Sequence, residues 1–265
     1  MPFTELYDSV LSTISSADFD IKFRGTAVPF LSGLVTSSGL EILSSHSEID
    51  YIVLDKEVQV FLKESRPLIR ADQVERNLGV TGRGIGVCVI DTGVDYTHPA
   101  LGGCFGQNCK VVAGYDFCSV FSNGACVSTD PDPLDVSGHG THVAGTVGSL
   151  DTNYRGIAPG VNIIALKALA ANGGTMSSVA ASIDWCVRNQ DAYNIKIITL
   201  SLGEPFTTYS RANCPATLSP SITAAIRAGI FVDVASGNEG SLTGLTNPAC
   251  DPQVAAVGAV YDSNV

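Results

Sequence analysis

The protein has 265 residues, of which 45% are hydrophobic and 15% charged, a composition that indicates a well-cored globular chain and excludes an intrinsically disordered one. Its 26 acidic and 15 basic side chains give a net charge of −11, which argues against sequence-independent nucleic-acid binding because such binding depends on Lys and Arg. No apolar run approaches the roughly 18 residues of a membrane-spanning helix, and the N-terminal sequence MPFTELYDSV lacks the apolar core of a signal peptide.

Residues 1–62 predict a small α+β module. Apolar residues recur at helical spacing between Thr4 and Ser15. After this helix the sequence predicts two strand-like segments, a short helix and two further strands, at residues 21–30, 32–37, 38–46 and 49–62. A polar run with Pro67 and several glycines follows, so residues 63–80 are predicted to be a linker.

From Gly86 onward, short apolar runs rich in β-branched residues alternate with helical sequences. The predicted strands are 86–93, 163–169, 195–203, 230–237 and 254–260, and the predicted helices are 141–150, 176–190 and 220–229. Continuous apolar strands separated by helices predict a parallel sheet with helices on both faces. In such α/β sheets, functional residues gather at the carboxyl ends of the strands.

Eight cysteines are many for a reducing compartment. Two pairs are close together in loop-like sequence, and we predict that both are disulfides, with free loop thiols as the alternative: Cys104–Cys109 and Cys118–Cys126. Cys214 and Cys250 are a candidate longer-range pair. Cys88 and Cys186 lie in apolar segments and are expected to be buried small hydrophobic residues. An oxidising destination without a signal peptide predicts a chain truncated at its N-terminus.

Three side chains at predicted strand or helix ends suggest catalytic chemistry, two as an acid–base pair and one as an oxyanion donor. Asp91 ends the first strand of the sheet, in VIDTGVDYTHP, where a buried carboxylate can accept a ring N–H; alone, it could equally cap a turn. His139 begins a helix in SGHGTHVAGTVG and can act as a base. Asn238, in VASGNEG, presents an amide at a strand tip, where an oxyanion donor would lie. The edge Ser201-Leu202-Gly203 can pair with an extended peptide by strand addition.

Two other interpretations of these motifs are weaker. His139 and His142 form an H-x-x-H pair, but no third ligand is placed and no Glu follows the first histidine, so we do not expect zinc. The glycines of TGRGIG at 81–86 precede a strand instead of following one, so no helix N-terminus is placed to hold a dinucleotide pyrophosphate.

In the order Asp, His, Ser-Leu-Gly and Gly-Asn-Glu-Gly, these motifs resemble those of the subtilisin-like serine endopeptidases, the subtilase family. The resemblance covers about residues 80–265, and GHGTHVAG at 138–145 is its most specific motif. It implies that Asp91 orients the histidine, that His139 is general base and then acid, and that Asn238 stabilises an oxyanion. It implies a substrate-binding role for Ser201, Leu202, Gly203, Gly173, Gly174, Ala235, Ser236 and Gly237. The small residues of the last group suggest a pocket for a sizeable apolar side chain.

The resemblance also implies a domain organisation and a setting. Residues 1–62 resemble a partial prodomain of the inhibitor type, ferredoxin-like in fold, and 81–265 the N-terminal portion of a catalytic domain whose sheet is incomplete. The prodomain would act as an intramolecular inhibitor, with residues 55–66 running toward the Ser201–Gly203 edge. The resemblance further implies a secreted monomer that acts on polypeptides without a cofactor.

The sequence departs from the family in three respects. The nucleophile of the family lies in a G-T-S-x-A-x-P turn, which is absent here, so we expect the chain to stop before the catalytic serine and to be inactive alone. Ala100 stands where the calcium site of the family has an aspartate, so we expect no metal. Asp233 falls within an apolar strand and has no evident partner. The leading hypothesis is a protease fragment, and the alternative is a non-catalytic pseudoprotease that binds peptides.

Overall fold

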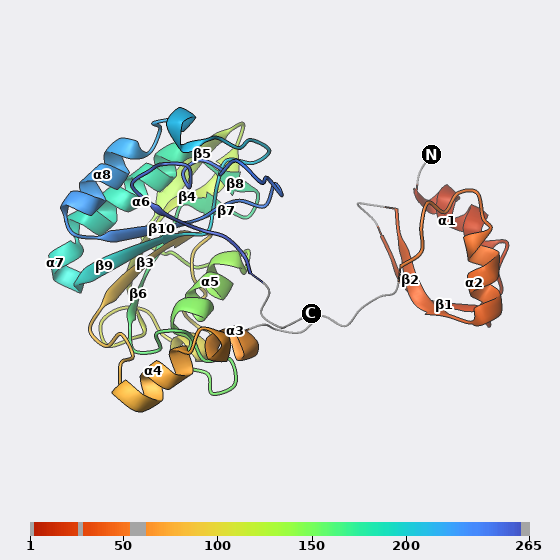
Figure 1. Cartoon of the computed structure of the whole chain (residues 1–265), viewed down its shortest axis with the longest axis horizontal. Coiled ribbons are helices and arrows are strands. Elements are labelled where there is room, and N and C mark those ends of the chain that lie inside the picture. The colour runs from red at the N-terminus through yellow and green to blue at the C-terminus, as the bar shows by residue number, and fades with distance from the viewer. Residues whose placement is uncertain (1–2, 26–28, 54–61, 261–265) are drawn as a thin grey trace. The chain divides into compact units, whose positions relative to one another are not determined.

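The computed structural model describes residues 3–25, 29–53 and 62–260 (Figure 1). The chain divides into two compact units, residues 1–59 and 60–265. Each unit has its own apolar core, and each is described separately below.

The smaller unit packs two helices on a two-stranded antiparallel sheet. Its elements are α1 (Phe3–Leu11), β1 (Phe19–Arg24), β2 (Leu31–Val35) and α2 (Ser37–Ser44). Val10, Phe19 and Leu43 form the buried centre of its core. Thr36 caps α2, since its side chain accepts a 3.1 Å hydrogen bond from the Gly39 amide. The two helices and the first two strands agree with the sequence-based expectation.

The end of this unit differs from that expectation. Two strands were predicted over residues 49–62, but residues 49–53 form no strand, and residues 54–61 lie outside the described part of the chain. The predicted path of residues 55–66 toward Ser201–Gly203 therefore falls largely outside the described residues. A ferredoxin-like fold for this unit remains a prediction.

Residues predicted as a linker are helical where they join the larger unit. They form α3 (Leu62–Leu68) and α4 (Ala71–Leu78), separated by Arg70 in the left-handed region and followed by Gly79, also left-handed. Glu75 on α4 accepts hydrogen bonds of 3.1 and 2.7 Å from Nε and Nη2 of Arg155, and it also pairs with Arg66. This bidentate contact attaches α4 to the rest of the larger unit. The polar composition of residues 63–80 had predicted a linker and gave no sign of this attachment.

The larger unit is built on a seven-stranded sheet in the order β11-β10-β9-β3-β6-β4-β5. Its strands are β3 (Gly86–Asp91), β4 (Val111–Ser122), β5 (Ala125–Asp130), β6 (Asn162–Lys167), β9 (Ile195–Leu200), β10 (Phe231–Ala235) and β11 (Ala255–Val257). All neighbouring pairs are parallel except β4 and β5. The structure confirms the predicted parallel sheet.

Helices cover both faces of this sheet (Figure 1). On one face α5 (His139–Gly148) contributes Ala144 to a core with Val87, Val89 and Ile163. The opposite face carries α6 (Met176–Arg188) and α8 (Ser219–Arg227), whose apolar residues pack on a second and larger core. The remaining elements are the short segments η1 (Pro99–Leu101), β7 (Leu169–Ala170), β8 (Gly173–Gly174), α7 (Gln190–Tyr193) and η2 (Arg211–Asn213).

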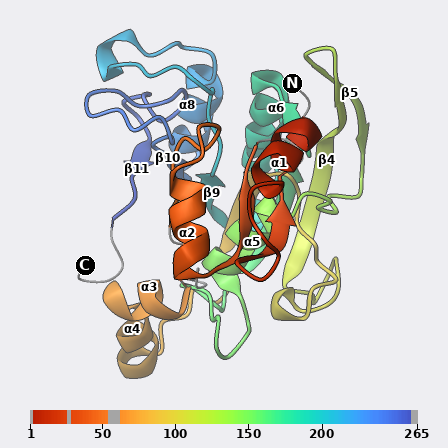
Figure 2. The same cartoon turned by 90° about the vertical axis from the view of Figure 1, so that its right-hand side faces the viewer.

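The hairpin of β4 and β5 was not predicted from the sequence. Figure 2 shows it at one edge of the sheet, with β10 and β11 at the other. Only the first part of β4 alternates as a half-buried strand, while β5 is largely exposed and polar, which explains why no strand pattern was evident there. The Cys118–Cys126 disulfide joins the two strands.

All eight cysteines are paired in four disulfides. The predicted Cys104–Cys109 and Cys118–Cys126 bonds and the candidate Cys214–Cys250 pair are confirmed. Cys88 and Cys186 are fully buried, as expected. They are not separate small hydrophobic residues, however, because they form a disulfide with each other. Cys88 on β3 meets Cys186 on α6 across 98 positions, and such a contact cannot be deduced from local sequence.

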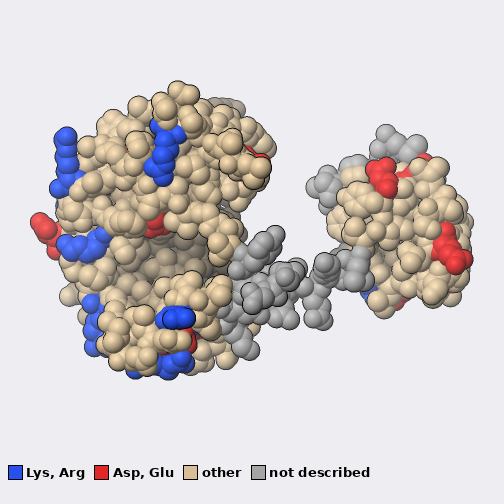
Figure 3. Space-filling model, in the orientation of Figure 1, with Lys and Arg blue, Asp and Glu red and all other residues tan. Residues whose placement is uncertain are grey.

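The basic side chains of the larger unit are spread out on the face that Figure 3 shows. In the view of Figure 3, Lys and Arg side chains on this unit are scattered and form no continuous basic patch. Among the described residues, no helix combines the length and apolarity needed to cross a bilayer.

Candidate active site

Asp91 and His139 lie side by side at the carboxyl end of the sheet. Asp91 is the last residue of β3, and His139 is the first residue of α5, which follows a left-handed Gly138. Oδ1 of Asp91 is 2.6 Å from Nδ1 of His139, so the ring N–H can donate to the carboxylate. Strand and helix ends therefore bring together two residues that are 48 positions apart.

The environment of Asp91 is almost entirely protein. Its exposed fraction is 0%, and Oδ1 also accepts a 2.7 Å hydrogen bond from the Thr92 amide. Burial raises the pKa of Asp91 above its ordinary value, and the hydrogen bonds from His139 and Thr92 offset this only in part. Oδ2 is buried without a hydrogen-bond partner among the described residues. An ionised Asp91 thus gains strongly from a positive charge on the neighbouring ring.

The histidine ring is open to solvent on its other side. Its side chain is 54% exposed, in contrast to the buried carboxylate that holds Nδ1. Within the described chain, no group forms a hydrogen bond with Nε2. One ring nitrogen is therefore fixed by the protein and the other is accessible, the arrangement that a general base needs.

Asn238 and the segment before it follow β10 at the same end of the sheet. Ala235 ends the strand, Ser236 is half-buried, and Gly237 adopts a φ of 113°, a conformation suited to glycine. The Asn238 side chain is exposed and makes no hydrogen bond within the described chain. Asn238 thus follows the carboxyl end of β10, as Asp91 ends β3, and forms no hydrogen bond with Asp91 or His139.

The Ser201–Gly203 segment leaves β9, which lies between β3 and β10 in the sheet. The last pair in the parallel register of β9 and β3 is Leu200 with Ile90, so Ser201 and Asp91 each follow directly after it in the chain. Ser201 and Leu202 are half-buried, whereas Gly203 is exposed. The segment therefore leaves the sheet from the strand next to the one that carries Asp91, and its last residue is accessible.

Thr246 lies between the two segments that were predicted to bind substrate. A Cβ on Gly203 would lie 2.6 Å from Oγ1 of Thr246, and a Cβ on Gly237 would collide with its Cγ2. The Thr246 amide donates a 3.0 Å hydrogen bond to the Ser236 carbonyl, which fixes it there. Thr246 therefore packs against both glycines, and no sequence motif pointed to this residue.

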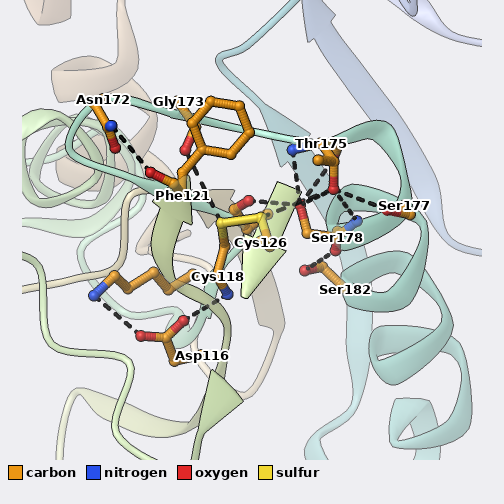
Figure 4. Close-up of a disulfide and its surroundings, with 12 residues drawn as sticks. Asp116, Cys118, Phe121, Cys126, Asn172, Gly173, Thr175, Ser177, Ser178 and Ser182 are labelled. Atoms are coloured by element: carbon orange, nitrogen blue, oxygen red, sulfur yellow. Dashed lines mark hydrogen bonds and ion pairs between the residues drawn. A yellow bond between two sulfur atoms is a disulfide. The ribbon is translucent and has the colours of Figure 1, made fainter. Parts of the chain in front are cut away.

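Gly173 and Gly174 form β8 and pair with β7 beside the β4–β5 hairpin. Figure 4 shows the Cys118–Cys126 disulfide in this region, with Phe121 close to Gly173. The Asn172 side-chain amide donates a 3.1 Å hydrogen bond to the Phe121 carbonyl, and a Cβ on Gly173 would lie 3.3 Å from the Phe121 ring. The hairpin therefore supports the glycine edge from one side.

No metal site is evident in the part of the chain that the structure describes, where no three His, Cys, Asp or Glu side chains are grouped to hold an ion. His142 lies one turn after His139, and its side chain is exposed.

Comparisons with known proteins agree with this fold. The profile of the Subtilase family matches residues 82–265. Serine protease AprX from Bacillus subtilis (strain 168) is 34% identical over 256 residues, covering 92% of this chain, and an alkaline protease from Alkalihalobacillus alcalophilus is 31% identical over 261 residues, covering 97%. A crystal structure of a cold adapted subtilisin-like serine proteinase aligns with 69% of this chain at 33% identity and a TM-score of 0.54. The chain belongs to the subtilase family.

The chain spans only part of these relatives. It covers 54% of AprX, 61% of the alkaline protease and 57% of the cold adapted proteinase. The family membership therefore concerns the fold of residues 82–265, the part of the chain that the family profile matches.

Proposed function

We propose that residues 81–265 supply the aspartate and the histidine of the catalytic triad of a serine endopeptidase. The observation that carries this proposal is the 2.6 Å contact between Nδ1 of His139 and the fully buried Oδ1 of Asp91. In this role Asp91 orients the ring and stabilises the imidazolium that forms when Nε2 of His139 takes a proton from the nucleophile. His139 then returns the proton to the leaving amine, and Asn238 donates to the oxyanion.

The substrate in this proposal is an extended polypeptide. Its backbone would pair with the Ser201–Gly203 edge by strand addition, with Gly173 and Gly174 on the other side. Ala235, Ser236 and Gly237 would form one wall of the main specificity pocket. The parallel pairing of β9 with β3 supports this placement, because the Ser201–Gly203 segment follows the strand next to the one that ends in Asp91.

The nucleophile is proposed to lie outside these 265 residues, since the G-T-S-x-A-x-P motif of the family is absent from them. Residues 1–265 alone should then neither cleave casein nor react with a fluorophosphonate probe of serine nucleophiles. Labelling of any serine in this chain, abolished by His139→Ala, would contradict this part of the proposal.

The smaller unit is proposed to be a prodomain that inhibits the catalytic domain, in a secreted and monomeric protein. The four disulfides support an oxidising compartment. The test is the N-terminus of the mature protein, determined by mass spectrometry of secreted material. It should lie after residue 59 and before Thr81, whereas a mature chain that retains residues 1–59 would exclude a removable prodomain.

The enzymatic proposal is tested with the whole open reading frame that encodes these residues. Casein cleavage should be lost in His139→Ala, because loss of the histidine lowers kcat on the order of 10⁶-fold in subtilisin, a value known for that enzyme. His142→Ala is the matched control, since this exposed histidine lies one turn further along α5 and should be dispensable. Peptide binding without cleavage by the whole protein would favour the alternative, a pseudoprotease.

A further inference from the structure

The helix that begins with His139 has no cap of its own. Its N-cap residue is Gly138, with a φ of 92° and no side chain to accept a hydrogen bond. The first N–H groups of a helix have no partner within the helix and need acceptors from elsewhere. The start of α5 therefore depends on residues outside it.

Two side chains supply these acceptors. Oγ1 of Thr92 accepts a 2.9 Å hydrogen bond from the Gly140 amide, and Oδ2 of Asp135 accepts one of 2.9 Å from the Thr141 amide. Thr92 directly follows Asp91, so one of the two caps comes from the residue next to the carboxylate. The first turn of α5 is thus bound to the end of β3.

Asp135 connects the two caps. Its Oδ1 accepts hydrogen bonds from Thr92 Oγ1 at 3.0 Å and from the Ser137 amide at 2.8 Å, and its Oδ2 also accepts a 2.6 Å bond from Thr141 Oγ1. Only 8% of this residue is exposed. Burial alone would raise the pKa of Asp135, but its hydrogen bonds, those from Thr141 first, lower it below the ordinary value. Asp135 is therefore an ionised carboxylate, and each of its oxygens accepts two hydrogen bonds.

The strand end and the helix start are in close contact. A Cβ on Gly140 would collide with the Gly93 carbonyl oxygen and would lie 3.0 Å from Oδ1 of Asp91. Since His139 precedes Gly140 in the same turn, a change in how this turn sits on residues 91–93 changes the distance between the ring and the carboxylate.

We propose that Asp135 is a positioning residue for the Asp91–His139 pair, acting through Thr92 and Thr141. It fixes the first turn of α5 against the end of β3 and so keeps Nδ1 within hydrogen-bonding distance of Oδ1. The relevance of this role to catalysis rests on the proposed function, in which Asp91 and His139 are catalytic residues. Neither Asp135 nor Thr92 was singled out in the sequence.

The test measures the hydrogen bond itself in residues 1–265, without substrate or nucleophile, so that its outcome is independent of whether the protein is a protease. In protein with ¹⁵N-labelled histidine, the Nδ1 proton of His139 is observed by NMR and assigned by its loss in His139→Gln. In Asp135→Ala, exchange of this proton with water should be roughly tenfold faster, because local opening becomes easier. Thr92→Val should have the same effect and Thr92→Ser should restore slow exchange, which gives a second route if Asp135→Ala does not fold.

Asp151→Ala is the matched control. Asp151 lies just beyond the other end of α5 and accepts backbone hydrogen bonds of 2.7 and 2.8 Å from Asn153 and Tyr154, so its loss also removes hydrogen bonds to a carboxylate. Slow exchange of the His139 proton should persist in this variant. Folded Asp135→Ala and Thr92→Val proteins with unchanged exchange would overturn the proposal, as would equal acceleration in Asp151→Ala.

Discussion

Thr199 on β9 donates a 2.7 Å hydrogen bond to Oδ2 of Asp233 on β10, and the two residues are direct partners in the parallel register. This contact supplies the partner that the sequence did not reveal for Asp233. Burial raises the pKa of Asp233 above its ordinary value, and the Thr199 hydroxyl offsets the effect only in part. The ionised carboxylate is therefore a cost to the fold at neutral pH, with consequences that can be measured.

Asp233→Asn should stabilise the protein at neutral and alkaline pH. Because the folded-state pKa is raised, the stability that Asp233 contributes is fully present below the unfolded value of 3.8 and is lost as pH rises through the folded value. Asparagine does not titrate, so the advantage of the variant should shrink as pH falls. Urea denaturation at about pH 4 and about pH 8 measures this difference.

Thr199→Val should instead cost about 1–3 kcal/mol at neutral pH, because it leaves the carboxylate of Asp233 without its donor. An Asp233→Asn variant that is less stable than the parent protein at alkaline pH would contradict the predicted direction of the stability change.

The packing of Gly203 against Thr246 predicts a steric effect on stability. Gly203→Ala should destabilise residues 1–265 by about 1–3 kcal/mol, because the new Cβ would lie 2.6 Å from Oγ1 of Thr246. In a Thr246→Gly background the same substitution should cost less, since Oγ1 and the Cβ of residue 246 are gone. A double-mutant cycle from chemical denaturation gives this coupling. Equal costs in both backgrounds would mean that Thr246 does not fill the space beside Gly203.

The four disulfides should differ widely in their contribution to stability. Removing Cys88–Cys186 with paired alanines should cost roughly 4–5 kcal/mol on the chain-entropy estimate, since the bond closes a loop of 98 positions through the core. The Cys104–Cys109 bond closes only 5 positions, so the corresponding double variant should lose much less. Thermal denaturation of the two double variants makes the comparison, and a similar loss in both would contradict the loop-length argument.

Glu75 should hold α4 in place in an acid-sensitive manner. The Arg155 side chain, and then Arg66, lower the pKa of Glu75, so its contribution to stability is present above the unfolded value of 4.5 and is lost as pH falls through the folded value. Glu75→Gln should cost about 1 kcal/mol at neutral pH and speed hydrogen exchange of residues 71–78. The control is Arg188→Ala, which removes an exposed pair with Asp184 and should change stability little. Unchanged exchange in Glu75→Gln would show that α4 is held by other contacts.

Local sequence determined the order of strands and helices in the larger unit. Runs such as 86–93 and 195–203 are apolar and β-branched over the length of a strand, and the helices between them are amphipathic, so each element is specified by its own residues. The same locality explains the two short disulfides, because loops of 5 and 8 positions restrict the choice of partner. It also explains why some elements were missed: the exposed hairpin β4–β5 and helices α3 and α4 were not predicted, because contacts with other parts of the chain stabilise them.

Only the tertiary structure decided which distant residues meet. Cys88 with Cys186, Thr199 with Asp233 and Glu75 with Arg155 are pairs set by strand register and helix packing, not by spacing along the chain. The motif order suggested that Asp91 and His139 serve one site. The sequence could not indicate that Thr92 and Asp135 together cap the start of α5. A hydrogen bond depends on tenths of an ångström between side chains, and that precision arises when the sheet and its helices pack into a single arrangement.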